Sequence, residues 1–368
     1  MTRLGAVDTE RMRQALALAE DAVGRSDPNP RVGCVIGDAD GRVFGTGSTQ
    51  QAGGPHAEVM ALRAAQAAGA PLHGATAWVT LEPCAHFGRT PPCTQALIAA
   101  GLARVVVGAV DPFPQVAGAG IAGLRAAGVQ VDLAGEDIAT AVRELNIGFF
   151  SRIERGRPWV RAKVAASLDG RTALPDGTSQ WITGPQARAD GHAWRRRAGA
   201  VLTGVGTVLA DDPRLDVRAV PTVVQPLRVV VDAMLRTPAT ARVLQPPGRV
   251  LVATAVGQAP RADYPADVDW LALPPGPGGL DLAALVAELG TRHHVNELHV
   301  EAGAQLTGSM LRAGLVDELL VYLAPKLLGP GRGMVDLPPL RALDDAVGLR
   351  FHELTTVGDD LRLRVRQR

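Results

Sequence analysis

Several features that mark other classes of protein are scarce in this sequence. Aromatic residues make up 4% of the chain, and 38 basic residues against 37 acidic ones leave a formal net charge of +1. A nucleic-acid-binding surface needs a basic groove with stacking aromatic side chains, so both scarcities argue against it. The longest apolar runs, such as residues 105–110, are far shorter than the ~18 residues that cross a bilayer. We therefore expect neither a nucleic-acid partner nor a membrane span.

Lysine and cysteine are also rare. The only lysines are Lys163 and Lys326, and the other basic residues are all arginines in a chain rich in glycine and proline. We attribute the arginine excess to biased codon usage and infer no arginine-rich binding surface from it. Three cysteines in 368 residues argue against a disulfide framework and leave reduced thiols for a metal or for catalysis. The N-terminal segment is charged and lacks a secretory signal, which predicts a cytoplasmic protein.

The length of 368 residues predicts two domains. In the first part of the chain, apolar residues recur at helical steps, as Met12, Ala15 and Ala19 do, and short apolar strands alternate with such helices. This alternation is typical of a sheet covered by helices. The predicted helices are 11–23, 56–68, 92–100, 120–127 and 136–150, and the predicted strands are 32–36, 42–47, 75–81, 104–110 and 129–133.

The charged segment 152–158, which contains glycine and proline, predicts the domain boundary. After it the same alternation returns, which predicts a second α/β domain with its own sheet. Residues 257–267 and 274–279 are polar or rich in glycine and proline and predict loops. The predicted strands are 159–165, 200–203, 228–232, 250–253, 268–273, 297–301 and 318–324, and the predicted helices are 186–197, 282–290 and 304–313.

A zinc site is the strongest local prediction. His56 is followed by Cys84 and, nine residues later, by Cys93. Catalytic zinc takes three protein ligands of the histidine and thiolate kind and leaves the fourth position open. Both His56 and Cys93 follow a proline at a predicted helix start, where the helix dipole favours thiolate. The sequence therefore predicts zinc bound by one imidazole and two sulfurs.

Glu58 completes this motif. Zinc lowers the pKa of bound water towards ~7, and a carboxylate must then handle protons. Glu58 lies two residues after His56 at a helix start, so it can reach the cavity without being a ligand. His-x-Glu followed by Pro-Cys and a further Cys is the pattern of nucleobase deaminases, although here eight residues separate the cysteines. The alternative is that the three residues share this pattern by chance and that the cysteines are only small buried side chains. We interpret Cys34, in a short apolar strand, as such a core residue.

The segments SDPNPRVGCVIGDADGRVFGTG, GGPHAEVMAL and TLEPCAHFGRTPPCTQALIAAG resemble the deaminase domain of the bifunctional riboflavin-biosynthesis deaminase/reductase family. The resemblance implies a cytidine-deaminase-like three-layer α/β/α domain at residues 1–150. It also implies that Asn29 contacts the pyrimidine and that His86 and Arg89 hold a phosphoribosylamino substrate. Thr49 stands where a histidine is common in the family, so no substrate contact is implied there.

The segment that begins RPWVRAKVAASLDGRTALPDG and continues through SQWITG and VLTGVGTVLADDPRLDVR resembles the reductase domain of the same family. The segment Gly204-Val-Gly206-Thr207 is by itself weak evidence for a nucleotide-binding site, because it lacks the dinucleotide-binding fingerprint. The resemblance implies a dihydrofolate-reductase-like α/β domain at residues 158–368 that binds NADPH. The cofactor contacts it implies are Ala165, Trp181, Thr207, Asp211, Gly303, Ala304, Gln305 and Leu306. The substrate contacts it implies are Ser179, Arg195, Leu215, Arg218 and Glu301.

Three residues of this domain are also candidates on chemical grounds. Arginine binds phosphate through paired hydrogen bonds, which makes Arg195 and Arg218 candidate anchors for a ribose phosphate. Lys163 lies on the predicted strand that opens the domain. Its ammonium is a candidate catalytic group that polarises or protonates the sugar, and a solvated strand charge is an equal alternative.

The family resemblance implies two consecutive reactions on small phosphoribosylaminopyrimidines. Zinc-dependent hydrolysis would remove the 2-amino group of 2,5-diamino-6-(5-phosphoribosylamino)pyrimidin-4(3H)-one. Reduction by NADPH would then give 5-amino-6-(5-phosphoribitylamino)uracil. A homo-oligomer is also implied, because dimers or tetramers are usual in the family. The alternatives are a nucleic-acid deaminase, which composition disfavours, and a pyrimidine-nucleotide-binding regulatory protein, which the intact ligands and Glu58 disfavour for the first domain.

Overall fold

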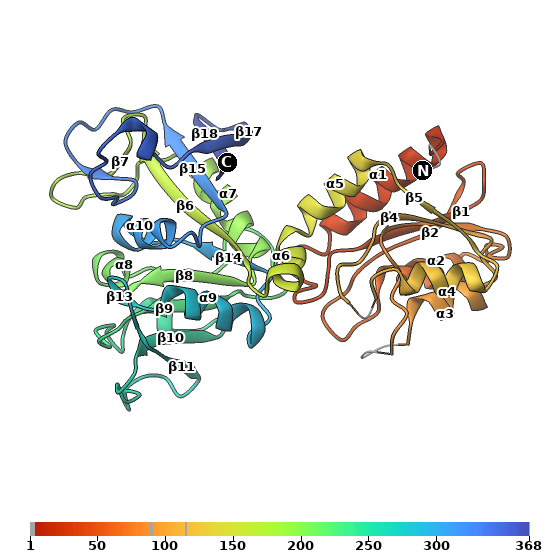
Figure 1. The fold of residues 1–368 in the computed structure, drawn as a ribbon, viewed down its shortest axis with the longest axis horizontal. Helices are drawn as coiled ribbons and strands as arrows, with labels where there is room; N and C mark the ends of the chain where they lie inside the picture. Colours follow the sequence, from red (N-terminus) through yellow and green to blue (C-terminus); the bar gives the residue numbers. More distant parts are fainter. Residues whose placement is uncertain (1–3, 88–90, 115, 368) are drawn as a thin grey trace. The chain divides into compact units, whose positions relative to one another are not determined.

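The computed structural model describes residues 4–87, 91–114 and 116–367. The chain divides into two compact units, an N-terminal unit of residues 1–156 and a C-terminal unit of residues 157–368. Figure 1 follows the chain from the red N-terminus to the blue C-terminus. Within the described residues, no helix is both long and apolar enough to span a bilayer.

The N-terminal unit is built on a five-stranded sheet with strand order β2-β1-β3-β4-β5. Its first strands are antiparallel, since β1 pairs with both β2 and β3, whereas β3, β4 and β5 are parallel. Gly41, with φ of +89°, lies in the turn that joins β1 to β2. The strands are β1 (Gly33–Gly37), β2 (Val43–Ser48), β3 (Thr76–Leu81), β4 (Arg104–Ala109) and β5 (Gln130–Leu133).

Helices cover both faces of this sheet. α1 and α5 contact each other and one face, and α2, α3 and α4 cover the other face (Figure 1). The fully buried Met12, Trp78 and Leu124 contribute to the core between these layers, which gives the predicted three-layer α/β/α arrangement. The helices are α1 (Ala6–Glu20), α2 (Ala57–Ala67), α3 (Cys93–Ala99), α4 (Ala119–Ala126), α5 (Glu136–Leu145) and α6 (Ile147–Arg155).

A nine-stranded sheet forms the C-terminal unit, in the order β11-β10-β9-β8-β14-β6-β15-β18-β17. Its strands are parallel up to β15, and β18 and β17 close one end antiparallel. The strands are β6 (Trp159–Ser167), β8 (Ala200–Gly204), β9 (Leu227–Val231), β10 (Val250–Ala255), β11 (Val268–Leu273), β14 (Glu297–Val300), β15 (Glu318–Ala324), β17 (Leu349–Val357) and β18 (Asp360–Gln367). Short ladders join β7 (Arg171–Ala173) to β16 (Arg332–Gly333) and β12 (Pro275–Gly276) to β13 (Gly279–Leu280).

The two faces of the nine-stranded sheet differ in chemistry. One face buries Leu202, Leu289 and Met310 in an aliphatic core with α9 and α10. The other face packs against α7 and α8, and it carries many charged side chains beneath α7. The helices are α7 (Pro185–Arg197), α8 (Val205–Asp211), α9 (Leu282–Thr291) and α10 (Ala304–Arg312), with short 3-10 turns η1 (Arg242–Leu244) and η2 (Leu343–Asp345).

Three secondary-structure predictions need correction. The predicted helix 136–150 is two helices, because the backbone of Asn146 (φ −104°, ψ 21°) interrupts it between α5 and α6. The first helix begins at Ala6 and ends at Glu20, so the predicted bounds 11–23 are shifted. The predicted loop 274–279 contains β12 and the start of β13. In addition, α8, β17 and β18 lie in segments for which we predicted no element.

Candidate active sites

The three predicted zinc ligands meet in the N-terminal unit. His56 caps the N-terminus of α2, Cys84 follows β3, and Cys93 is the first residue of α3. The Nδ1 atom of His56 lies 3.6 Å from Sγ of Cys84 and 3.4 Å from Sγ of Cys93. All candidate ligand atoms lie within 4.8 Å of one another. One imidazole nitrogen and two sulfurs in this arrangement fit the ligand set of a catalytic zinc.

Local hydrogen bonds hold the two cysteines together. The backbone N–H of Cys93 donates to Sγ of Cys84 over 3.3 Å, and Thr94 Oγ1 donates to the Cys84 carbonyl over 3.2 Å. Hydrogen bonding from Cys93, followed by that from His56, lowers the pKa of Cys84 to about 4. The same contact raises the pKa of Cys93. One sulfur of the pair is therefore already suited to bind a metal as thiolate.

Glu58 lies beside the ligands without being one of them. Its side chain is in the first turn of α2 and only 3% of the residue is exposed. Burial raises the pKa of Glu58 to about 7, and the neighbouring His56 offsets part of this effect. A buried carboxyl group with a pKa near neutrality can both accept and donate a proton.

The predicted substrate contacts of this unit have different surroundings. Asn29 lies in a turn closed by its N–H to the Ser26 carbonyl, over 2.9 Å. Nδ1 of His86 is buried and has no hydrogen-bond partner among the described residues. Arg89 lies outside the described residues. The Thr49 hydroxyl is buried, and its hydrogen bonds go to the backbone N–H and carbonyl of Val32.

Our sequence reasoning missed two residues that position this site. Asn146 accepts from the Arg31 N–H over 2.7 Å and donates to the Arg31 carbonyl over 2.9 Å, which holds the segment that follows Asn29. Glu82, two residues before Cys84, accepts from the N–H groups of Gly118 and Ile121. The Glu-Pro-Cys context was a signal for Glu82, whereas nothing local pointed to Asn146.

A single cavity of about 1260 Å³ in the C-terminal unit brings together all the predicted reductase residues. It lies beside the carboxyl ends of β8, β9 and β14, where ligands bind in open parallel sheets. Its lining includes Lys163, Ala165, Ser179, Trp181, Arg195, Thr207, Asp211, Leu215, Arg218, Glu301, Gly303, Ala304, Gln305 and Leu306. Their separate roles stay predictions.

The glycine positions of this cavity fit a nucleotide cofactor. Gly303 caps α10, and no side chain caps that helix N-terminus. A Cβ added at Gly303 would meet only Thr207 Oγ1, at 3.9 Å, and one added at Gly206 would meet nothing within 4 Å. Open space above uncapped helical N–H groups is suited to a phosphate. This geometry fits the prediction that Gly303 to Leu306 contact the cofactor, which stays a prediction.

A charged cluster occupies the cavity wall. Arg195 donates to both carboxylate oxygens of Glu301, through Nε to Oε1 and through Nη2 to Oε2 over 3.0 Å. Nζ of Lys163 lies 3.9 Å from Oε2 of Glu301. Burial raises the pKa of Glu301, but Arg195 outweighs it and the pKa falls well below its ordinary value. Burial lowers the pKa of Lys163, which Glu301 partly opposes.

The remaining predicted anchors differ in accessibility. Arg218 is half exposed and donates to Oδ1 of Asp216 over 2.6 Å. His192, which we did not predict, also lines the cavity, and its Nδ1 accepts from the Arg218 N–H over 3.4 Å. Burial lowers the pKa of His192 to about 4, so its imidazole is neutral at physiological pH. Both arginines are paired with a carboxylate, but the side chain of Arg218 is 50% exposed and that of Arg195 is 14% exposed. Arg218 can therefore reach a phosphate more readily than Arg195.

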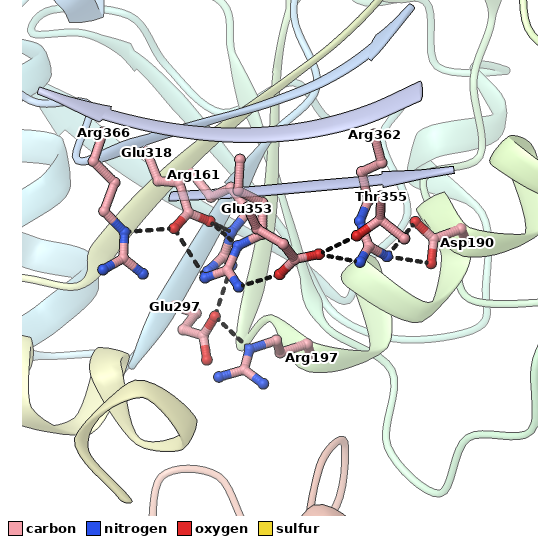
Figure 2. A network of polar contacts seen from close by, with 10 residues as sticks. Arg161, Asp190, Arg197, Glu297, Glu318, Glu353, Thr355, Arg362 and Arg366 are labelled. Atoms are coloured by element: carbon pink, nitrogen blue, oxygen red, sulfur yellow. Dashed lines mark hydrogen bonds and ion pairs between the residues drawn. The ribbon is translucent and has the colours of Figure 1, made fainter. Parts of the chain in front are cut away.

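A network of ion pairs continues from this cavity beneath α7 (Figure 2). Arg161 on β6 bridges Glu297 and Glu318, at 2.7 Å and 2.6 Å, and all three side chains are almost fully buried. Figure 2 shows how the network extends across β15, β18 and β17 to Glu353 and Arg362. Most of its charged atoms pair within the network, whereas Nη2 of Arg161 and Nε of Arg362 are buried and have no hydrogen-bond partner among the described residues.

Family comparisons agree with both units. Residues 6–109 match the cytidine and deoxycytidylate deaminase zinc-binding region. Residues 158–363 match the RibD C-terminal domain. Together with the His56, Cys84 and Cys93 cluster and the cavity, these matches define a bifunctional enzyme with a zinc-type deaminase and a reductase.

Similarity to known proteins extends over nearly the whole chain. The riboflavin biosynthesis protein RibD of Escherichia coli is 46% identical, covering 96% of this chain and 98% of that protein. A structure of Acinetobacter baumannii RibD has a TM-score of 0.89 at 40% identity, with 98% and 99% coverage. A Thermotoga maritima diaminohydroxyphosphoribosylaminopyrimidine deaminase/5-amino-6-(5-phosphoribosylamino)uracil reductase has a TM-score of 0.88 at 31% identity, with the same coverage. The chain belongs to the RibD family.

Membership confirms the predicted resemblance and fold class, with a cytidine-deaminase-like domain before a RibD-type reductase domain. It also confirms the prediction of a bifunctional enzyme that uses Zn²⁺ and NADPH.

Proposed function

We propose that this chain catalyses two consecutive steps on one phosphoribosylaminopyrimidine. The first step is deamination of 2,5-diamino-6-(5-phosphoribosylamino)pyrimidin-4(3H)-one at residues 1–150. The second is reduction of the ribosyl group by NADPH at residues 158–368, which gives 5-amino-6-(5-phosphoribitylamino)uracil. The activities in the name of the Thermotoga maritima protein support this assignment. The convergence of His56, Cys84 and Cys93 beside buried Glu58 carries the first step.

In the deamination, His56, Cys84 and Cys93 would hold zinc, which would supply a Lewis acid that makes water nucleophilic at neutral pH. Glu58 takes a proton from the attacking water and delivers it to the leaving amino group. The ring carbon gains a C–O bond and loses its C–N bond, and ammonia departs. Asn29, His86 and Arg89 hold the pyrimidine and its phosphoribosylamino group.

In the reduction, bound NADPH would supply the hydride for the sugar carbon that carries the nitrogen. Ala165, Trp181, Thr207, Asp211 and the 303–306 segment hold the cofactor. Ser179, Leu215 and Glu301 contact the substrate, and Arg195 and Arg218 attract its phosphate. Lys163 supplies the proton that the opening sugar ring requires. The cavity volume of about 1260 Å³ supports simultaneous binding of cofactor and substrate.

The cellular context is also part of this proposal. The partners of the chain are small-molecule pyrimidine nucleotides, with no nucleic acid and no membrane. We further propose a cytoplasmic homo-oligomer, and size-exclusion chromatography with light scattering tests the oligomeric state.

Replacement of Glu58 by Gln tests the first step. The variant should keep its zinc but lose deamination by about 10²- to 10⁴-fold, the usual contribution of a general acid–base group. Reduction of the deaminated intermediate should be unchanged. Zinc content, ammonia release and NADPH oxidation are measured on the same preparation.

The exposed Glu20 at the end of α1 provides the matched control, since Glu20→Gln should change none of these measurements. Ammonia release by Glu58→Gln at the wild-type rate would refute the role of Glu58. Ammonia release by the wild type without any NADPH oxidation would remove the reductase step from the proposal.

A further inference from the structure

A buried histidine stands between the cavity cluster and the ion-pair network. Glu297 and His299 lie on β14 and Glu301 follows it, at alternating positions that share one face of the sheet. Glu297 belongs to the network of Figure 2, and Glu301 belongs to the cavity. His299, which the function above does not use, lies between them and is 0% exposed.

The surroundings of His299 are charged on several sides. Arg161 on β6 is its register partner, and Arg195 on α7 and Lys163 on β6 lie around the same Glu301 carboxylate. Nε2 of His299 lies 3.5 Å from Oε1 of Glu301. Neither ring nitrogen has a hydrogen bond that meets normal geometry among the described residues. Burial lowers the pKa of His299, and Glu301 opposes this effect. Arg161 and Arg195 add to the lowering, so the pKa stays below its ordinary value.

A neutral imidazole has one N–H, and its position follows from these surroundings. The anion nearest the ring is Glu301, on the Nε2 side. An N–H on Nε2 therefore points a donor at a carboxylate, whereas a proton on Nδ1 would set the Nε2 lone pair against it. Burying an imidazole for packing alone is costly compared with an aliphatic side chain. Contacts of this kind are often long before a ligand binds.

We propose that His299 is a positioning residue of the reductase site that donates Nε2–H to Glu301 Oε1. Together with Arg195, this donor holds the carboxylate in the orientation in which Oε2 faces Lys163. The inference rests on the proposed contact between Glu301 and the substrate. His299 itself touches neither substrate nor cofactor.

Two substitutions separate positioning from packing. His299→Gln would keep an amide N–H near the place of Nε2, whereas His299→Leu would fill similar volume with no donor. We expect His299→Leu to lower kcat/KM for reduction of the deaminated substrate by about ten- to a hundredfold, as loss of supporting hydrogen bonds does at other sites. The glutamine variant should recover most of this loss. NADPH affinity, measured by fluorescence titration, and ammonia release should not change in either variant.

A purely structural role predicts a different result. The glutamine variant would then be no better than the leucine variant, since a polar amide fills an apolar space poorly, and thermal stability would fall in step with activity. Equal loss in both variants, or wild-type kinetics in His299→Leu, would overturn the proposal.

Nitrogen NMR of the full chain, labelled at its histidines, gives a readout that needs no turnover. The His299 signal, assigned by its loss in His299→Gln, should be that of a neutral ring protonated at Nε2, and Glu301→Gln should shift it. A ring protonated at Nδ1 would refute the inference. If the wild type reduces nothing, the proposed reductase function fails, while this spectrum still decides whether His299 donates Nε2–H to Glu301.

Discussion

At the scale of single residues, Glu318 shows how the charged layer beneath α7 is held. Its side chain is fully buried and accepts from Arg161, Arg364 and Arg366, at distances between 2.6 and 3.1 Å (Figure 2). Each buried arginine depends on a carboxylate to offset its desolvation. The network therefore makes the C-terminal unit sensitive to loss of any one member.

Replacement of Glu318 by Gln should lower the free energy of unfolding of the C-terminal unit by about 3–5 kcal/mol, because it leaves buried guanidinium groups without their countercharge. Urea denaturation followed by circular dichroism measures this. The matched control is Asp269→Asn, which breaks the exposed 2.7 Å pair with Arg249 and should have little effect. Equal effects of the two substitutions would contradict the interpretation.

The same carboxylates predict the pH dependence of stability. Burial raises the pKa of Glu318, but Arg161 and Arg364 outweigh burial and leave it lowered. The pKa of Glu353 falls to about 2, because hydrogen bonds from Arg362 and others overcome its burial. A lowered folded-state pKa stabilises the fold above the unfolded value of about 4.3, and this contribution disappears as pH falls towards the folded value.

We therefore expect the free energy of unfolding of the C-terminal unit to fall progressively from about pH 5 downwards. Urea titrations at a series of acidic pH values test this. Glu318→Gln should show a shallower fall, since it has lost one of the titrating groups. A stability that does not change on acidification would show that the network contributes nothing.

At the scale of elements, α2 is placed on the sheet by glycines of β2. A Cβ added at Gly47 would lie 2.4 Å from the Ala57 carbonyl oxygen and 2.6 Å from the Ala61 nitrogen, both in α2. Only glycine permits this close approach, which sets the position of the helix that has His56 as its N-cap and Glu58 in its first turn.

Gly47→Ala should push α2 away from β2 and destabilise the N-terminal unit by about 1–3 kcal/mol. Because this shift misplaces His56 and Glu58, deamination should fall by about a hundredfold. Reduction should be unaffected. The control is Gly123→Ala in α4, where an added Cβ meets nothing within 4 Å. Ammonia release, zinc content and urea denaturation of both variants test this, and wild-type deamination by Gly47→Ala would disprove it.

Elements were predictable to different degrees. The core helices and parallel strands follow from apolar periodicity, as in 56–68 and 104–110, which match α2 and β4 closely. The break at Asn146 was not predictable, because its reason is the pair of hydrogen bonds to Arg31, 115 residues away. β18 alternates in sequence as Leu-Arg-Leu-Arg-Val-Arg. This period-two alternation is a signal for a strand with one charged face, and only the structure shows that the arginines of this face pair within the network.

At the scale of the whole molecule, the two candidate sites draw their residues from separate units. The zinc ligands all come from the N-terminal unit, and every residue that lines the large cavity comes from the C-terminal unit. Each unit also has its own hydrophobic core. The chemistry of one site therefore does not need side chains of the other.

Removal of zinc with a chelator should abolish ammonia release and leave reduction of the deaminated intermediate intact, because only the first site needs a Lewis acid. Return of zinc should restore deamination. Parallel assays of ammonia and NADPH oxidation on the stripped protein test this. Loss of both activities on chelation would show that the sites depend on each other.

The chemistry of the first site was determined by sequence, because ligand types, their spacing and the prolines before two helices act over short stretches of chain. His56, Cys84 and Cys93 could be named without coordinates. Only tertiary structure decided that Arg195 is bonded to Glu301, 106 residues away, and that His299 is buried against the same carboxylate. The physical reason is that such contacts depend on the strand order and on the packing of α7. Both follow from the burial of residues that are far apart in the sequence, so no local pattern predicts them.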